Sequence, residues 1–138
     1  MTIAGIDHAA VPIGNVEEML SFYASLGFSV RSFGDDDLPI HAVMLDNIRL
    51  NFHEPKTWKT ADFPRGPNAL PGCGDFCFVW DGTVEEAVEF VCEKGVQIEF
   101  GPVERTGARA QSREIGDSIY FRDPDQNLLE FIIYRRST

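Results

Sequence analysis

The sequence is short of basic residues and of long apolar runs, and each shortage excludes a class of partner. Twelve lysines and arginines stand against 22 aspartates and glutamates, so the formal net charge at pH 7 is −10. A surface this negative repels phosphate backbones and anionic lipids, and we therefore expect the protein to bind neither nucleic acid nor membranes. No apolar run approaches the roughly 18 residues that a membrane-spanning helix requires.

Cysteine is too scarce for a disulfide framework or a zinc knuckle. Cys73, Cys77 and Cys92 are odd in number and form no CxxC pair, so we expect reduced thiols. The first residues carry Asp7 and His8 where a signal peptide needs an apolar run. These observations predict a cytoplasmic protein. Cys92 falls in a helical pattern and is expected to be buried as a small apolar side chain.

What the sequence does contain is an internal repeat. Residues 7–30 match residues 75–98 at a constant offset of 68, and eight positions are identical, Asp7 and Asp75 among them. Each copy has an apolar segment, then apolar residues at helical spacing, then a glycine of the kind that ends a helix in the left-handed conformation. Each copy therefore predicts a strand followed by a helix.

Capping residues and apolar runs set the expected bounds of the elements. Asn15 and Thr83 each precede a glutamate by three residues, which is the pattern of a capping box at a helix N-terminus. Three further extended runs follow each helix, and turn residues separate the last two. These strands are expected at residues 28–33, 40–45 and 48–53 in the first copy and at 96–100, 118–121 and 128–134 in the second.

The repeat predicts an α+β fold built from two βαβββ modules. Module 1 is expected at about residues 3–54 and module 2 at about 75–135, with a proline-rich linker at 55–74 that makes the chain a single domain. A four-stranded sheet with one helix cannot bury both of its faces alone. The modules are therefore expected to pair as curved mixed sheets around a concave site with the helices outside, and small-molecule sites lie in such concavities.

Few side chains on the expected strands can carry chemistry. His8 is placed in the first strand and Asp75 in the fifth, Asn51 and His53 share one face of the fourth, and Glu130 lies in the very apolar last strand. Each has a structural alternative when taken alone. The histidine can be a hydrogen-bonded strand residue, the aspartate a turn residue, and the glutamate an outward-facing residue, since an unpaired buried charge is costly.

Two segments resemble a known family. IDHAAVPIGNVEEMLSFYASLGF, near the start, and IYFRDPDQNLLEF, near the end, are similar to the vicinal oxygen chelate superfamily of glyoxalase I, fosfomycin-resistance thiol transferases, extradiol dioxygenases and bleomycin-binding proteins. Within it, GPVERTGA followed by SIYFRDPD resembles the glyoxalase domain-containing protein 5 type and its bacterial virulence-associated relatives. The resemblance covers nearly the whole chain.

The resemblance implies a divalent metal held by one residue from each of four strands. His8 matches the first ligand and Glu130 the last, while Asp75 stands where many members have a histidine. The fourth position falls on Asn51, an amide that we expect to orient a ligand or contact substrate, with His53 available two residues later. The expected ligands are therefore His8, His53, Asp75 and Glu130, and the expected ion is Mn, Fe, Ni or Zn.

The function that the resemblance implies is a metal-dependent lyase or isomerase of the glyoxalase type. The metal would polarise adjacent substrate oxygens, and Glu130 or Asp75 would be the catalytic proton-transfer base. Two alternatives stay open: a non-haem iron dioxygenase, which requires His53 to reach the metal, and a non-catalytic protein that sequesters a drug or metabolite. The family also implies a homodimer.

Three arginines in the segment 104–113 suggest an anionic substrate. An arginine fork binds carboxylate or phosphate through two parallel hydrogen bonds, and we expect Arg105 and Arg109 to contact the substrate in this way. The alternative is a solvated loop that offsets the acidic surface.

Overall fold

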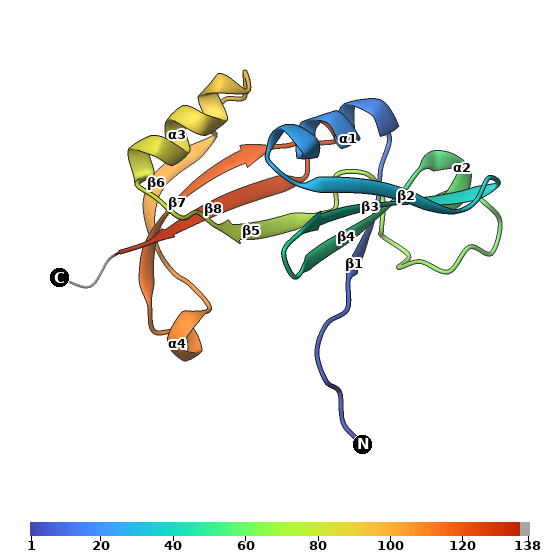
Figure 1. Cartoon of the computed structure of the whole chain (residues 1–138), viewed down its shortest axis with the longest axis horizontal. Coiled ribbons are helices and arrows are strands. Elements are labelled where there is room, and N and C mark those ends of the chain that lie inside the picture. The colour runs from blue at the N-terminus through green and yellow to red at the C-terminus, as the bar shows by residue number, and fades with distance from the viewer. Residues whose placement is uncertain (136–138) are drawn as a thin grey trace. The chain divides into compact units, whose positions relative to one another are not determined.

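The computed structural model describes residues 1–135 and contains two four-stranded mixed sheets (Figure 1). The chain divides into two compact units. Unit 1 contains residues 1–74 together with 124–126, and unit 2 contains residues 75–123 and the chain from 127 onward. No helix of the described residues is long and apolar enough to cross a membrane.

Unit 1 is built around the sheet with strand order β1-β4-β3-β2, in which β1 and β4 are parallel and the other pairs antiparallel. Met19 and Tyr23 of its long helix are fully buried, and the Tyr23 ring meets Phe52 edge-on at 5.1 Å. Its elements are β1 (Ala9–Pro12), α1 (Val16–Ser25), β2 (Ser29–Asp35), β3 (Leu38–Leu45), β4 (Ile48–His53) and α2 (Pro55–Trp58).

Unit 2 repeats the same strand order as β5-β8-β7-β6, again with one parallel pair. Ala87 and Val91 of its long helix are buried, as are Phe121 and Leu129 of the sheet. Its elements are β5 (Asp75–Val79), α3 (Val84–Glu93), β6 (Phe100–Thr106), α4 (Arg109–Ser112), β7 (Ile115–Arg122) and β8 (Leu128–Tyr134). The predicted α+β fold of paired βαβββ modules is confirmed.

The two long helices begin at the predicted caps, but only one capping box is complete. The Thr83 hydroxyl accepts from the Glu86 amide, and the Glu86 carboxylate accepts from the Thr83 amide. At the other helix, Asn15 Oδ1 accepts from the Glu18 amide at 3.0 Å. The backbone amide of Asn15 points instead to Oδ1 of Asp125 at 3.4 Å, so Asp125 takes the place of the reciprocal glutamate.

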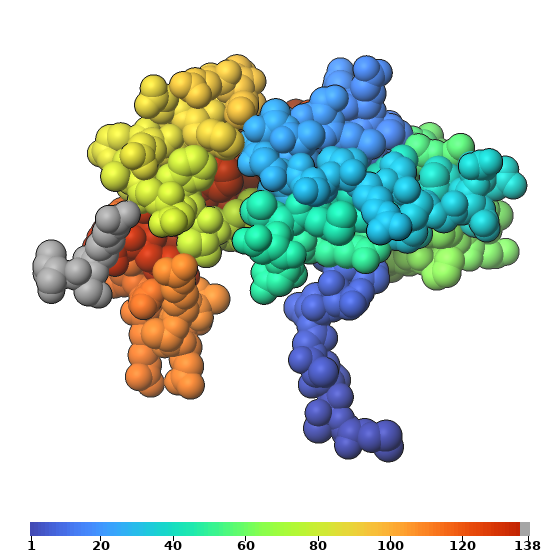
Figure 2. Space-filling view, in the orientation of Figure 1, coloured from blue at the N-terminus to red at the C-terminus, as the bar shows by residue number. Residues whose placement is uncertain are grey.

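Three local predictions were wrong. The strand expected at 96–100 lies at Phe100–Thr106, and Pro102 is tolerated there because β6 is an edge strand. Cys92 is exposed, because the buried stripe of α3 runs through Val91 and leaves its neighbour outside. His8 lies one residue before β1, at the base of an extended N-terminal segment that is drawn dark blue in Figure 2.

In each unit the long helix covers one face of the sheet (Figure 1). Because strand side chains alternate, Arg49, Asn51 and His53 lie on the opposite face of the sheet in unit 1. Glu130 and its neighbours across the ladder lie on the corresponding face in unit 2. The residues that could carry chemistry therefore occupy the two faces that these helices leave uncovered.

Candidate functional site

His8 and His53 lie on the same face of the sheet in unit 1. The parallel pairing of β1 and β4 places Pro12 opposite His53, and His8 precedes that strand on the same face. Burial lowers the pKa of His53, and the charge of His8 lowers it further. These effects keep His53 in the neutral form, which is the form of histidine that binds metals.

Asp7 orients the His8 ring. Oδ2 of Asp7 lies 2.7 Å from Nδ1 of His8, and this hydrogen bond and the charge of His8 lower the pKa of the carboxyl group. A carboxylate bonded to Nδ1 fixes the orientation of the ring and directs Nε2 to the opposite side, which is the usual arrangement around metal-binding histidines. Phe63 packs edge-on against the ring of His53 at 5.2 Å and restrains it in turn.

Glu130 is the centre of a polar cluster in unit 2. Its strand neighbours are Cys77 on β5 and Tyr120 on β7, and Ser118 Oγ donates a hydrogen bond of 2.6 Å to its Oε2. Desolvation of the thiol and the charge of Glu130 raise the pKa of Cys77 to about 12. Cys77 is therefore a protonated thiol at neutral pH, and Glu130 is a half-buried, hydrogen-bonded carboxylate.

Arg105 is held beside this cluster. Its Nε donates to the Tyr120 hydroxyl at 2.9 Å, and its guanidinium lies 5.7 Å from the centre of the Phe100 ring. Burial raises the pKa of Tyr120 more than Arg105 lowers it, so the phenol keeps its proton at neutral pH. Arg105, Phe100 and Tyr120 line a pocket of about 430 Å³, completed by Glu99, Arg122 and Leu128.

Arg109 lies at a different pocket from Arg105. It begins α4, its guanidinium stacks 4.3 Å from the Tyr134 ring centre, and its amide donates to the Tyr134 hydroxyl at 3.3 Å. Together with Trp80 and Glu114 it lines a pocket of about 530 Å³ that does not include Arg105. The structure thus does not bring the two predicted substrate arginines together.

Asn51 and Asp75 differ in their burial and surroundings. Asn51 is 4% exposed, and its Oδ1 accepts a hydrogen bond of 3.1 Å from Nε of Arg49. That bond occupies the oxygen with which an amide would bind a metal, which favours the orienting role. Asp75 opens β5 opposite Leu128, is exposed, and shares a sheet face with Glu130.

His8 and Asp75 occupy equivalent positions in the two units. In each parallel pair they lie two residues before the strand partner of Asn51 or of Glu130. The offset between these strands is therefore 67 rather than 68, because the strand-to-helix connection has three residues in unit 1 and four in unit 2. The identity of Asp7 with Asp75 in the sequence repeat does not reflect equivalent positions.

The four predicted metal ligands form two pairs, one in each unit. Within residues 1–135, no three His, Cys, Asp or Glu side chains lie close enough together to hold a metal ion. The donors nevertheless fit one in kind. Two imidazoles, with His53 held neutral, and two carboxylates are a set suited to Mn, Fe, Ni or Zn.

Sequence reasoning missed Ser118, Tyr120 and Arg49. The first two alternate with Ile119 and Phe121 in β7, so period-two patterning places them on one face of the strand. Only the β7–β8 register, which no local pattern specifies, puts that face beside Glu130. Arg49 carries the same kind of signal, since it lies two residues before Asn51 in a strand.

The profile of the Glyoxalase/Bleomycin resistance protein/Dioxygenase superfamily matches residues 5–131. The chain belongs to this superfamily. Glyoxalase domain-containing protein RDO1 of Mycosarcoma maydis is 33% identical over 138 residues, which are 98% of this chain and 71% of the relative. Virulence protein STM3117 of Salmonella typhimurium is 32% identical over 136 residues, or 97% of this chain and 87% of the relative.

Solved structures of the superfamily show the same fold. The crystal structure of STM3117 superposes with a TM-score of 0.82 and 32% identity, covering 98% of this chain and all of that one. TnmS3, an antibiotic-binding protein from Streptomyces sp. CB03234, has a TM-score of 0.70 at 20% identity and covers 98% and 99%. FosX from Listeria monocytogenes, complexed with Mn(II) and a dihydroxypropylphosphonic acid, has a TM-score of 0.62 at 20% identity and covers 95% and 93%. These last two share the fold alone.

Proposed function

We propose that the protein is a metal-dependent enzyme of the glyoxalase type, a lyase or isomerase that acts on a small oxygenated metabolite. The observation that best supports this function is the histidine pair of unit 1. Burial lowers the pKa of His53 and favours its neutral form, and Asp7 holds the His8 ring through Nδ1. The superfamily adds support, since FosX, which has this fold, is a Mn(II)-bound protein.

The ion would be held by His8, His53, Asp75 and Glu130. A divalent ion bound to these side chains supplies a Lewis acid for adjacent oxygens of the substrate. Asp7 keeps the His8 ring in one orientation, and Ser118 does the same for the Glu130 carboxylate.

Glu130 is the residue we assign to proton transfer, with Asp75 as the second candidate. Oε2 of Glu130 accepts from Ser118 at 2.6 Å, so Oε1 would bind the ion and, once released from it, would take a proton from the substrate. Tyr120 lies beside it as a protonated phenol held by Arg105, and both can donate hydrogen bonds to a substrate oxygen that gains negative charge.

A non-haem iron dioxygenase is the second candidate, and the same histidine pair favours it. Two histidines and one carboxylate are the ligand set of many iron oxygenases, and His8, His53 and Glu130 would supply it. Oxygen uptake with Fe²⁺ and a catechol would separate this function from the lyase, which consumes no oxygen.

A binding protein that sequesters a small molecule is the third candidate. The pocket of about 430 Å³ beside Arg105 and Tyr120 supports it, because pockets of this size bind small ligands without any metal. A rise in melting temperature on ligand addition that a chelator leaves unchanged would favour this function.

The metal content of tag-free protein, measured by inductively coupled plasma mass spectrometry, tests the first proposal. We expect near-stoichiometric Mn, Fe, Ni or Zn in the wild type and its loss in Glu130→Gln and His53→Ala. Glu104→Gln is the matched control, since this exposed carboxylate of unit 2 pairs with Arg135 rather than with a candidate ligand. Wild-type protein that stays metal-free after reconstitution would overturn the proposal and leave the binding protein in first place. Sedimentation of the same samples would test the homodimer that the family implies.

A further inference from the structure

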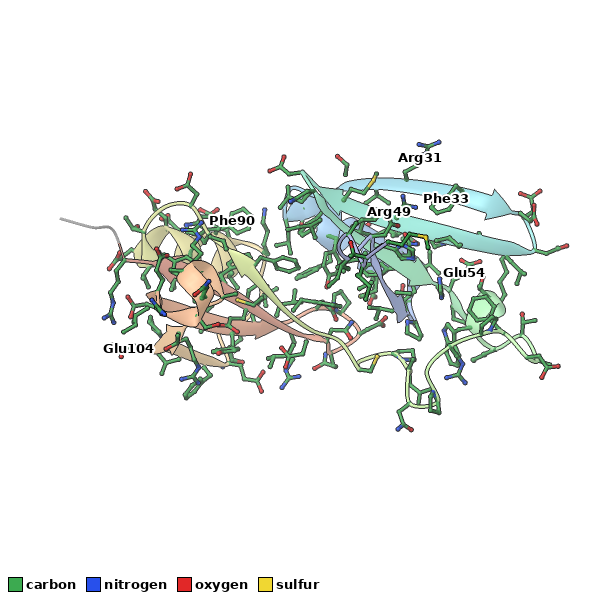
Figure 3. The ribbon with its side chains drawn as sticks, turned by 90° about the horizontal axis from the view of Figure 1, so that it is seen from below. Arg31, Phe33, Arg49, Glu54, Phe90 and Glu104 are labelled. Atoms are coloured by element: carbon green, nitrogen blue, oxygen red, sulfur yellow. The ribbon has the colours of Figure 1, made fainter. Side chains whose placement is uncertain are left out.

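The open face of the unit 1 sheet has a small pocket between two arginines. Ladder pairing sets Arg31 opposite Ala42 and Arg49 opposite Met44, and the pocket of about 190 Å³ is lined by these four residues and Phe33. Figure 3 shows the labelled side chains of Arg31, Phe33 and Arg49 at this sheet. We call it the arginine pocket.

Neither arginine of this pocket forms an ion pair with an acid among residues 1–135. Within the described residues 1–135, Arg31 and Arg49 form no ion pair, whereas Arg122 pairs with Glu99 at 2.6 Å and Arg135 with Asp117 at 2.9 Å. Acidic residues outnumber basic residues in the chain by 22 to 12, so two arginines that form no ion pair with a carboxylate are unexpected. Two such guanidinium groups attract an anion from outside the chain.

Arg49 is positioned before any ligand arrives. Its Nε donates to Asn51 Oδ1 at 3.1 Å, and the guanidinium lies 5.1 Å from the centre of the Phe33 ring. The hydrogen bond and the ring contact hold the guanidinium in place, so it loses little conformational freedom when a ligand binds. Its terminal N–H groups can then donate hydrogen bonds to the ligand. Ala42 forms the floor of the pocket, where a larger side chain would take up the space.

We propose that the arginine pocket binds the anionic group of a small molecule, a carboxylate or a phosphonate attached to an apolar or flat body. The planar forks of Arg31 and Arg49 match the oxygens of such a group, and Phe33 and Met44 provide the apolar contact. The pocket is smaller than the roughly 300–1,000 Å³ of a site that encloses a drug-sized ligand, so it holds one end of the molecule.

The pocket adjoins the histidine pair. Arg49 and Asp7 are near enough for the charge of the arginine to lower the pKa of the carboxyl group, and Asp7 holds His8. This inference rests on the proposed function insofar as the anion belongs to the substrate, because its reactive end would then lie toward His8 and His53. Binding of the anion itself requires no metal.

The test uses the full chain stripped of metal with a chelator, and calorimetric titration with phenylphosphonate and benzoate as probes. Benzyl alcohol is the neutral analogue of both. We expect binding of at least one anion, an affinity lowered about tenfold or more in Arg31→Gln and in Ala42→Leu, and no binding of benzyl alcohol. Arg65→Gln is the matched control, because this arginine of unit 1 bonds to backbone carbonyls of the linker.

The larger side chain in Ala42→Leu can disturb the sheet, and Arg31→Gln then provides the result on its own. Arg31 is exposed, and its replacement leaves no buried group unpaired. Circular dichroism of each variant checks the fold. Equal affinity for benzyl alcohol, or unchanged anion affinity in Arg31→Gln, would overturn the proposal. Anion binding by wild-type protein that stays metal-free after reconstitution would sink the enzyme function alone and leave the arginine pocket standing.

Discussion

Unit 1 and unit 2 have the same strand order, yet their open faces carry different chemistry. Unit 1 presents two imidazoles and two arginines that form no ion pair among residues 1–135, whereas unit 2 presents a glutamate bonded to Ser118 and arginines that are paired or stacked. The comparison shows which features the two copies of the repeat share. Strand order and caps depend on backbone hydrogen bonds and are kept, while the open face contributes little to the core and is free to diverge.

The largest expected effect concerns the contribution of each hydrophobic core to the free energy of unfolding. Phe52→Ala in unit 1 and Phe121→Ala in unit 2 each remove a fully buried ring, and each should lower the free energy of unfolding by about 3–5 kcal/mol. Urea unfolding followed by fluorescence and circular dichroism measures both. If one variant unfolds a single unit and the other the whole chain, the units are not equal partners in stability.

The next effect concerns the groups that orient the candidate ligands. Asp7→Asn in unit 1 and Ser118→Ala in unit 2 each remove one hydrogen bond from a ligand, so each should weaken metal binding about 10–100-fold. Competition with a chelating dye measures the affinity. A change confined to one variant would mean that only that unit contributes ligands.

A smaller effect distinguishes the two helix caps. Thr83→Ala removes the hydroxyl of a complete capping box and should cost about 1–2 kcal/mol, whereas Asn15→Ala removes one bond and should cost about 1 kcal/mol or less. Asp125 already serves the Asn15 amide, so Asp125→Ala combined with Asn15→Ala should bring the loss in unit 1 up to that of Thr83→Ala. Thermal unfolding of the variants provides the comparison.

The smallest effect contrasts the arginines. Arg135 lowers the pKa of Asp117, so their pair adds stability above the ordinary aspartate value of 3.8, and this contribution is lost as pH falls below it. Arg135→Ala should therefore lower the melting temperature slightly at pH 7, and the difference from wild type should shrink as the pH falls below 3.8. Arg31→Ala should cost nothing at either pH, because Arg31 has no acid to lose. A destabilised Arg31→Ala would contradict the unpaired state on which the arginine pocket depends.

Most of the fold could be predicted because its signals are local. Asn15 and Thr83 mark helix starts through their own side chains, and the apolar runs mark strands. The strand at Phe100–Thr106 was misplaced because Gly101 and Pro102 argue against a strand, and only its position at the sheet edge makes them acceptable.

The candidate site was less predictable, since its neighbours come from other strands. Glu130 could be singled out as a charge in an apolar strand, but Ser118 and Tyr120 become its neighbours only through the β7–β8 register. Likewise, the repeat aligned Asp7 with Asp75, and a difference of one residue in connection length makes His8 the equivalent residue instead. Registers and connection lengths are set by packing across the whole sheet, and a short sequence pattern does not predict that packing.

Asp125 has a consequence for how the protein is made. It lies late in the chain, yet its carboxylate accepts the Gly14 amide at 2.8 Å and belongs to unit 1. A ribosome releases the chain from its N-terminus at roughly 5–20 residues per second, and N-terminal domains usually fold as they emerge. The first repeat cannot complete its fold in this way, because the connection before α1 gains this acceptor only after residue 125 has left the exit tunnel.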